Sequence, residues 1–316
     1  MVFLVACGSV PAPKTDGGNG DSVDADPAAP PTVVSTMPAN AAAGVKPDAK
    51  IVVTFSKPMD QASVLAAWTS ADLPTSQAQF AWNSAGDTLT VTPSQPLPVA
   101  TGSGLDPTTV TALEITYSIA ASATDTTDKP LTASLAVKFT TVKRMTHDIA
   151  NIDALTQSVA NDGTVISPSS GGVGKSNFTN VFFRVFASFQ LPTLVAGATV
   201  ETAQLVGRQE TVTGAPYTKL GNLKAQHVNF AQFDANTFAA TPLGNPIGDF
   251  STNATVEQKS LDVTAQVRDD YANSAARGGR SQYRLEYPLG TNNDGVRDIA
   301  FFTRTAFALR LTYTAN

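Results

Sequence analysis

Residues 50–60 read KIVVTFSKPMD, and the first half of this stretch decides the fold of the N-terminal part of the chain. Ile51, Val53 and Phe55 occupy every second position, so in an extended strand they lie on one face. Strands that carry one apolar face are typical of antiparallel sheets packed as a sandwich. The same period of two recurs in three further segments: DTLTVTP (87–93), LEITYSIA (113–120) and LAVKFTT (135–141).

One short helix is expected in this part of the chain. The segment DQASVLAAW (60–68) lacks the period of two, and Asp60 is placed to act as its N-cap. We expect the two tryptophans, Trp68 and Trp82, to fill the core or one end of the sandwich rather than to stack on a sugar.

The composition agrees with many short strands joined by turns. Hydrophobic residues make up 42% of the 316 residues and charged residues 15%, against about 25% charged in an average domain. The 20 Pro and 22 Gly supply turns, and the length allows two domains.

Charge, cysteine content and hydropathy exclude several classes of protein. The net charge of −5 gives no basic footprint and argues against nucleic acid as a partner. The single cysteine excludes an internal disulfide and a zinc site built from several cysteines. No run of about 18 or more apolar residues occurs, so we expect no transmembrane helix.

The first half resembles a known family. The stretch PTVVSTMPANAAAGVKPDAKIVVTFSKPMDQASV, with TFSKPMD at residues 54–60 as its most recognisable piece, is similar to the opening of bacterial Ig-like domains of S-layer and other surface proteins. The closing LAVKFTT is similar to the family's final strand. The resemblance implies an Ig-like sandwich over residues 32–142 that serves as a spacer without an active site.

The N-terminal segment, residues 1–31, resembles the start of a bacterial lipoprotein. Leu4-Val5-Ala6-Cys7 is similar to a lipobox, and this resemblance implies that Cys7 becomes the acylated N-terminal residue and anchors the protein in a membrane of the cell envelope, at the outer membrane or cell surface. Only three residues precede the box, and none is Lys or Arg, so either the start codon lies further upstream or the segment is not a signal. The Gly-, Pro- and Asp-rich residues 8–31 are expected to form a disordered tether.

Two patterns mark the second half. In NFTNVFFRVFASFQLP (177–192) both alternating faces are largely apolar, which predicts a central strand covered on both sides. Further along, Val263, Val267 and Tyr271 fall on one stripe of a helix. Asp262 is its expected cap and Gly278-Gly279 its expected end.

Residues 145–316 resemble the DNRLRE family of jelly-roll sandwiches. The matching pieces stand in the family's order: FFRVFASFQLPTLVAGATVETAQL, LGNLKAQHVNF, LDVTAQVRDDYA, QYRLEYPLGTNNDGVRDIAFF and LRLTYT. Some members of that family bind carbohydrate, alginate-like polysaccharides among them, and others are structural. The family's Asp after the first Phe-rich strand is missing here, which weakens any inference about a site beside that strand.

Candidate sites are few, and no catalytic residue is predicted. Asn292, Asp294 and Asp298 form an oxygen-rich loop that suits Ca²⁺, although a β-turn explains the same residues. Tyr217, in TGAPYTKLG, is the candidate for stacking on a sugar. The segment SSGGVGKSN (169–177) departs from the phosphate-loop pattern, and we interpret it as a mobile loop.

The sequence therefore predicts an all-β protein of two tandem β-sandwiches, Ig-like and then jelly-roll with one short helix. We expect a monomeric, non-catalytic surface lipoprotein that displays a polysaccharide-binding module, with membrane and polysaccharide as partners and no cofactor other than Ca²⁺. Two alternatives stay open. One is a purely structural spacer, and the other is a hydrolase that acts on polysaccharide.

Overall fold

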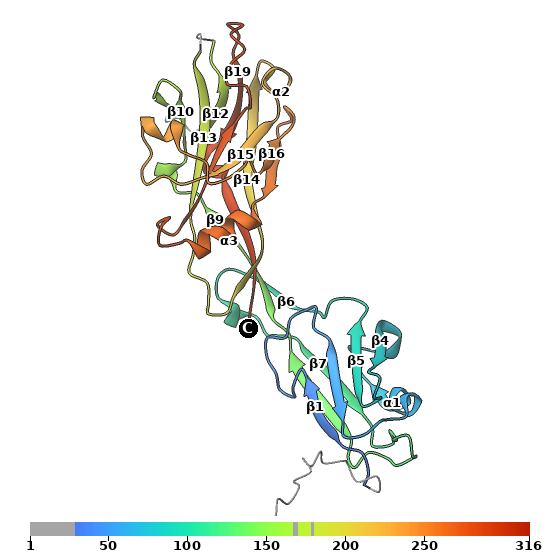
Figure 1. Cartoon of the computed structure of the whole chain (residues 1–316). Helices are drawn as coiled ribbons and strands as arrows, with labels where there is room; N and C mark the ends of the chain where they lie inside the picture. Colours follow the sequence, from blue (N-terminus) through green and yellow to red (C-terminus); the bar gives the residue numbers. More distant parts are fainter. Residues whose placement is uncertain (1–28, 167–169, 178–179) are drawn as a thin grey trace, which may run out of the picture. The chain divides into compact units, whose positions relative to one another are not determined.

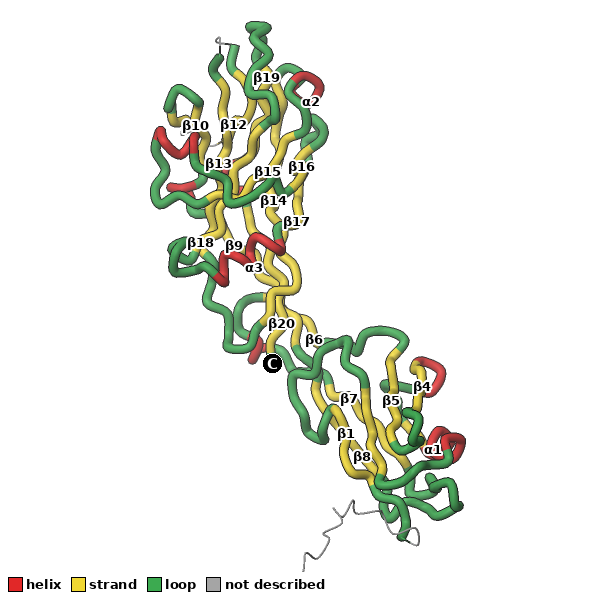
Figure 2. Tube along the Cα trace, in the orientation of Figure 1, coloured by secondary structure: helices red, strands yellow, loops and turns green. Residues whose placement is uncertain are grey.

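The computed structural model describes residues 29–166, 170–177 and 180–316, which form two compact units (Figures 1 and 2). The first unit holds residues 29–39, 50–94 and 116–137, and the second holds residues 40–49, 95–115 and 138–316 of this described part. Cys7 and residues 8–28 of the expected tether lie outside it. The domain limits at residues 32, 142 and 145 stay predictions.

Strands make up 44% of the structure and helices 13%, which confirms the all-β fold expected from the sequence. The first unit contains one helix and the strands of two sheets, the last two strands being divided between the units. Its elements are β1 Val33–Met37, β2 Ile51–Phe55, α1 Gln61–Ala67, β3 Trp68–Thr69, β4 Ala78–Trp82, β5 Thr88–Pro93, β7 Glu114–Ile119 and β8 Leu135–Thr140.

The inward face predicted from KIVVTF is confirmed. β1, β2, β5 and β4 form an antiparallel sheet in that order, and the side chains of Ile51, Val53 and Phe55 are at most 2% exposed. The second sheet has the order β3-β7-β8. Trp68 of β3 is buried and meets Phe80 of β4 edge to face at 5.3 Å, so aromatic side chains join the two sheets.

Asp60 caps α1 as predicted. Its Oδ1 accepts a hydrogen bond from the backbone N–H of Ser63 at 2.6 Å, which satisfies one of the free amides of the first turn. Val64 and Ala67 are the buried residues of this helix.

The second unit is one long sheet folded into two layers around one main core. The strand order is β16-β15-β18-β13-β12-β19-β14-β20-β9-β6, with β10, β11 and β17 paired beside this path. Its strands are β6 Ala100–Ser103, β9 Lys143–Ala150, β10 Gln157–Ala160, β11 Val165–Ile166, β12 Ser170–Lys175, β13 Phe182–Gln190, β14 Thr199–Thr213, β15 Leu223–Val228, β16 Gly248–Ser251, β17 Gln258–Asp262, β18 Arg280–Glu286, β19 Asp298–Thr303 and β20 Ala308–Ala315. Its helices are α2 Pro216–Lys219 and α3 Thr264–Ala272.

Five short 3-10 helices lie in the connections of the two units. They are Thr75–Gln77, Pro107–Thr109, Asp153–Leu155, Ala235–Ala239 and Arg304–Ala306.

β13 is covered on both faces, as its sequence predicted. Val185, Ala187 and Phe189 belong to the main core of the second unit. Phe186 on the opposite face joins a smaller apolar cluster with Phe230, from the chain segment that follows β15.

Residues 170–175 of the segment expected to be a mobile loop form strand β12, so that prediction was wrong for them. β12 pairs with β13 and β19, and Gly174 adopts φ +125° with the backbone of Asp298 so close that a Cβ would lie 2.2 Å from its carbonyl oxygen. Glycine in a strand marks such close approach of another backbone. The glycines of this segment suggested a mobile loop, but Gly174 is required by tight packing against β19.

The helix predicted after Asp262 is α3, and its apolar stripe is confirmed. Val263 and Val267 are fully buried. The expected cap at Asp262 was wrong, because Val263 is the N-cap residue, although Asp262 Oδ1 accepts a hydrogen bond from the N–H of Thr264 at 2.8 Å. The helix ends at Ala272, before the predicted Gly278-Gly279. The side-chain amide of Asn273 donates to the carbonyl oxygen of Asp269, which satisfies a carbonyl of the last turn.

Truncation of Leu89 tests the core of the first unit. Leu89 is 1% exposed, and Leu89→Ala is expected to lower the free energy of unfolding by about 2–5 kcal/mol because it removes buried methyl groups and leaves a cavity. Leu65→Ala on α1 is the matched control, because the Leu65 side chain is 44% exposed. This variant should change the free energy of unfolding by about 0.5 kcal/mol or less. Both tryptophans lie in the first unit, so tryptophan fluorescence during urea unfolding reports on it. Equal losses in the two variants would contradict the assignment of Leu89 to the core.

Candidate binding sites of the second unit

The structure brings Tyr217 and the loop that contains Asp294 to one end of the second unit. α2, which carries Tyr217, packs beside β19, which begins at Asp298. The Tyr217 ring is half-buried and meets Tyr287 edge to face at 5.5 Å, while its hydroxyl donates to Oε1 of Gln209. Burial raises the pKa of Tyr217. Tyr217, the candidate for stacking on a sugar, therefore already forms a hydrogen bond and an aromatic contact within the protein.

Two lysines and two aspartates form a charge cluster at the same end. Lys175 ends β12 and pairs in register with Asp298 of β19. The Lys175 ammonium contacts Oδ1 of Asp294, and Lys219 Nζ lies 3.0 Å from Oδ2 of the same carboxylate. The distances from Asp298 Oδ2 to Lys175 Nζ and Lys219 Nζ are 3.7 and 3.5 Å. We call these four residues the charge cluster.

Burial in the charge cluster is uneven. Lys175 is 1% exposed and Asp298 0% exposed, whereas Asp294 and Lys219 reach the surface. Asp298 Oδ1 accepts a hydrogen bond from the N–H of Ala215 at 2.7 Å, while Oδ2 has no hydrogen-bond partner among the described residues. The ammonium groups of Lys175 and Lys219, together with the N–H of Val296, hold the pKa of Asp294 well below its usual range.

The predicted calcium ligands are already paired with other side chains. Asp294 and Asp298 face two ammonium groups, and the Asn292 amide donates to Asp294 Oδ2 at 3.0 Å. Within residues 29–166, 170–177 and 180–316, no three His, Cys, Asp or Glu side chains gather in a way that could hold a metal ion. A Ca²⁺ ion would have to displace both lysines from the carboxylates, so this arrangement does not fit calcium, and calcium binding stays a prediction.

An open groove of about 560 Å³ lies between α3 and the segment that joins β13 to β14. Leu194 and Val195 supply apolar surface from that segment, and Tyr271 supplies an aromatic ring from α3. The Tyr271 hydroxyl donates to the carbonyl oxygen of Pro192 at 3.0 Å, and burial raises the pKa of Tyr271 to about 12, so it stays protonated at neutral pH. We call this cavity the Tyr271 groove.

Arg268 places a fixed positive charge at the Tyr271 groove. Its Nε and Nη2 donate to the carbonyl oxygen of Val200 at 3.0 and 2.8 Å, and Nη2 also donates to that of Glu201 at 3.1 Å. Hydroxyl groups of Thr193, Thr199 and Ser274 complete the lining. The groove therefore combines apolar surface, one aromatic ring, hydroxyls and one guanidinium.

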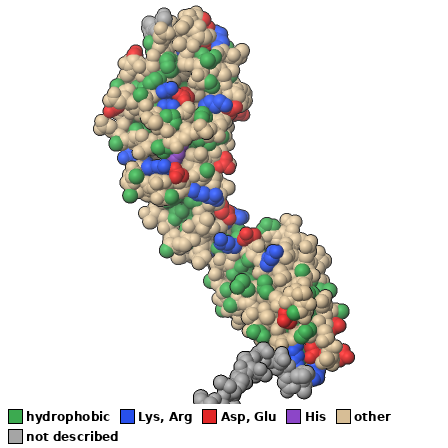
Figure 3. Space-filling model, in the orientation of Figure 1, with side chains coloured by type: hydrophobic (Ala, Val, Ile, Leu, Met, Phe, Trp, Pro, Cys, Tyr) green, Lys and Arg blue, Asp and Glu red, His purple; other side chains and the backbone are tan. Residues whose placement is uncertain are grey.

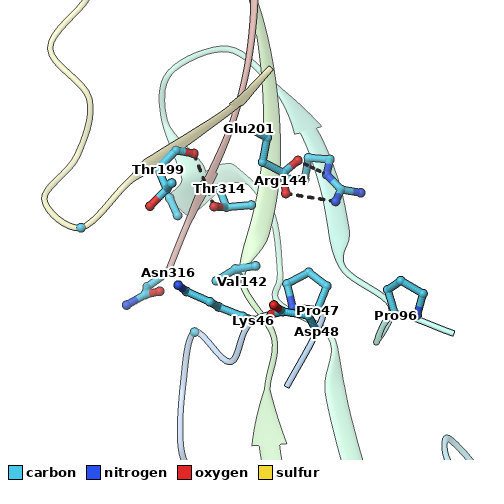
Figure 4. Close-up of a pocket in the computed structure, with 13 residues that line it drawn as sticks. Lys46, Pro47, Asp48, Pro96, Val142, Arg144, Thr199, Glu201, Thr314 and Asn316 are labelled. Atoms are coloured by element: carbon cyan, nitrogen blue, oxygen red, sulfur yellow. Dashed lines mark hydrogen bonds and ion pairs between the residues drawn. The ribbon is translucent and has the colours of Figure 1, made fainter. Parts of the chain in front are cut away.

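A second pocket, of about 430 Å³, is lined by residues of β9, β14 and β20 (Figure 4). Arg144 of β9 and Glu201 of β14 face each other there, with Nε 2.5 Å from Oε2 and Nη2 3.1 Å from Oε1. Hydrogen bonding to Glu201 raises the pKa of Arg144. Because this pair satisfies both charges, the pocket offers a ligand mainly the exposed Lys46 and Asp48 at its edge.

The two histidines lie in different surroundings. His147 is half-buried on β9, whereas His227 on β15 is buried and its Nε2 lies 2.9 Å from Oδ1 of Asp270 in α3. Arg277 contacts the same carboxylate from Nη1 at 2.5 Å. This buried group connects α3 to the sheet, and no sequence pattern predicted it because His227 lies 43 positions before Asp270.

Charged side chains on the face seen in Figure 3 lie in small groups of both signs rather than in a patch of one sign. None of the helices within the described ranges is long and apolar enough to cross a membrane.

Comparison with known proteins finds a family match for one segment of the chain. Residues 27–141 match the family model of the bacterial Ig-like domain, as expected from TFSKPMD. Domains of this family are typically extracellular or surface-associated. The sequence has no match among the curated proteins.

Similar solved structures are distant. An L,D-transpeptidase from Mycobacterium smegmatis is 22% identical, with 55% of this chain and 65% of that chain covered and a TM-score of 0.26. An S-layer protein is 16% identical, with 74% and 32% covered and a TM-score of 0.22. The protein SGBP-B from a xyloglucan utilization locus of Bacteroides uniformis is 9% identical, with 89% and 72% covered and a TM-score of 0.23. TM-scores this low carry no argument. The chain spans less than two thirds of the length of the transpeptidase.

Removal of Asp270 tests the buried group around His227. Asp270→Ala leaves a buried guanidinium and imidazole without this partner, and should lower the free energy of unfolding of the second unit by about 3–5 kcal/mol. The neighbouring Asp269, whose side chain is 50% exposed, is the matched control, and Asp269→Ala should cost about 1 kcal/mol or less. Calorimetry measures both, because the second unit contains no tryptophan. Equal effects of the two variants would refute the structural role of Asp270.

Proposed function

We propose that this chain, whose residues 27–141 match a bacterial Ig-like domain, is a non-catalytic protein displayed on the bacterial surface, and that its second unit binds an acidic polysaccharide. The Ig-like part acts as a spacer, and the jelly-roll resemblance of residues 145–316 suggests the binding module. Lipid on Cys7 provides the anchor to the cell envelope.

The Tyr271 groove is the observation that supports binding. Its volume of about 560 Å³ lies within the range of about 300–1,000 Å³ that is usual for ligand sites. Sugar rings present apolar C–H faces together with hydroxyl groups, which matches an apolar wall with an aromatic ring and several hydroxyls. Arg268 favours a uronate over a neutral sugar because its charge attracts a carboxylate.

Tyr217 is the less favoured site for the sugar. Its hydroxyl is bonded to Gln209 and its ring contacts Tyr287, so a ligand at this position would compete with contacts inside the protein. The charge cluster beside it is neutral overall, with two ammonium and two carboxylate groups.

A charge placed at the rim of the Tyr271 groove tests the proposed binding. Val195 is 40% exposed at this rim, so Val195→Glu should leave the fold intact and repel a uronate. We expect affinity for alginate to fall about tenfold or more, which corresponds to roughly 1.4 kcal/mol, in isothermal titration calorimetry of the full chain.

Three controls accompany this experiment. Val256 is 53% exposed away from the groove, and Val256→Glu adds the same charge without blocking the site. A neutral glucan should bind more weakly than alginate to the native chain. A loss of affinity in Tyr217→Ala but not in Val195→Glu would move the site to α2, and the absence of binding to any polysaccharide would favour a structural spacer.

The proposed anchor has a separate test. Replacement of Cys7 by Ala removes the thiol that would carry lipid, so the protein should move from the membrane fraction to the soluble fraction of the cells. Fractionation followed by immunoblotting measures this change, using the gene with any upstream start codon included. A native protein that is already soluble, or a Cys7→Ala variant that stays with the membrane, would contradict the anchor.

A further inference from the structure

We propose that Lys175 and Asp294 are joined by an amide bond between their side chains, formed within the folded second unit. Such a link would tie the end of β12 to the loop that enters β19. It goes beyond the proposed function, since it concerns the covalent structure of the module and not its ligand.

The fold places the two reacting groups in contact. Lys175 and Asp298 are register partners in adjacent antiparallel strands, so their side chains lie on the same side of the sheet. The loop before β19 brings Asp294 over the same position, where Oδ1 contacts the Lys175 ammonium. Residues that are 119 positions apart in sequence are thereby held together, and a fixed geometry of this kind can raise the effective concentration of a reacting group by orders of magnitude.

Burial favours loss of charge at this position. Lys175 is 1% exposed, and an ammonium group removed from water in this way is costly even when it is paired. Asp298 is fully buried, and its Oδ2 has no hydrogen-bond partner among the described residues although it points toward both lysines. This oxygen lies 3.7 Å from Lys175 Nζ and forms no hydrogen bond within the described ranges that would compete, so it is placed to accept a proton from the amine.

The reaction balances without a co-reactant. Nζ of Lys175 bonds to Cγ of Asp294, and one Cγ–O bond of that carboxyl breaks. Asp298 accepts two protons from Nζ, one after the other, and passes both to the leaving oxygen, which departs as water. Lys219, 3.0 Å from Oδ2 of Asp294, stabilises the negative charge that develops on the remaining oxygen. An ammonium and a carboxylate contain all the atoms of one amide and one water molecule.

The charges that remain after the reaction are also balanced. The unreacted cluster has two positive and two negative groups, and the amide removes one of each. Lys219 and Asp298 are left as a pair with Nζ 3.5 Å from Oδ2. Lys175 is then part of a neutral amide, and the buried carboxylate of Asp298 remains paired with the ammonium group of Lys219.

Peptide mapping by mass spectrometry tests the link on the full-length protein. After proteolysis we expect one branched peptide that contains both Lys175 and Asp294 and that is lighter than the two separate peptides by one water molecule. Two linear peptides, with Lys175 and Asp294 both unmodified, would overturn the proposal and leave the cluster as an ion pair only.

A succinimide at Asp294-Gly295 would lack the same water molecule, so fragmentation of the peptide is required. A dehydrated linear peptide with unmodified Lys175 counts against the proposal, and only a branched peptide supports it. Lys175→Met should abolish the branched peptide and leave any succinimide unchanged.

Two further variants test the proton acceptor. Asp298→Asn removes the buried carboxylate and should reduce the linked fraction strongly. Lys224→Met, which breaks the ion pair between Lys224 and Asp249 elsewhere in the same unit, is the matched control and should leave the link complete. A fully linked Asp298→Asn variant would overturn the role given to Asp298.

Discussion

The bulge in β14 between Gln209 and Thr211 is the constraint on which the second unit depends. Before it, β14 pairs with β20 and β17, and from Gln209 onward it pairs with β19. A bulge bends a strand and increases its twist, so one continuous strand can serve both layers of the sandwich. The Gln209 side chain is fully buried at this point, and its Nε2 donates to the carbonyl oxygens of Asn253 and Thr255 at 3.0 and 2.9 Å.

The candidate sites are distributed along this strand. Thr199, the first residue of β14, lines both the Tyr271 groove and the pocket that contains the Arg144–Glu201 ion pair. Its far end pairs with β19, whose first residue belongs to the charge cluster, and Gln209 accepts the hydrogen bond of Tyr217. The path of β14 therefore fixes the position of each site.

Paired charges are a second common feature of the unit. Asp270 with Arg277 and His227, Arg144 with Glu201, and the charge cluster all keep acidic groups beside basic ones. Charges that leave water need such partners, because an unpaired buried charge is strongly destabilising. The charged side chains on the face in Figure 3 also lie in small groups of both signs. For the binding that we propose at the Tyr271 groove, this arrangement favours recognition by shape and by a few fixed donors over recognition by a long-range electrostatic field.

The sequence by itself determined the all-β class, the inward face of Ile51, Val53 and Phe55, the cap at Asp60, the apolar stripe of α3 and the two-sided burial of β13. Each of these follows from local periodicity, which a strand or helix must express wherever one face is buried. Tertiary structure alone decided that residues 170–175 form strand β12, where Gly174 lies directly against the backbone of Asp298 in β19. It alone brought Lys175 to Asp294 and His227 to Asp270, since hydrogen bonds and ion pairs between distant segments depend on strand order and register, which no local pattern of residues encodes.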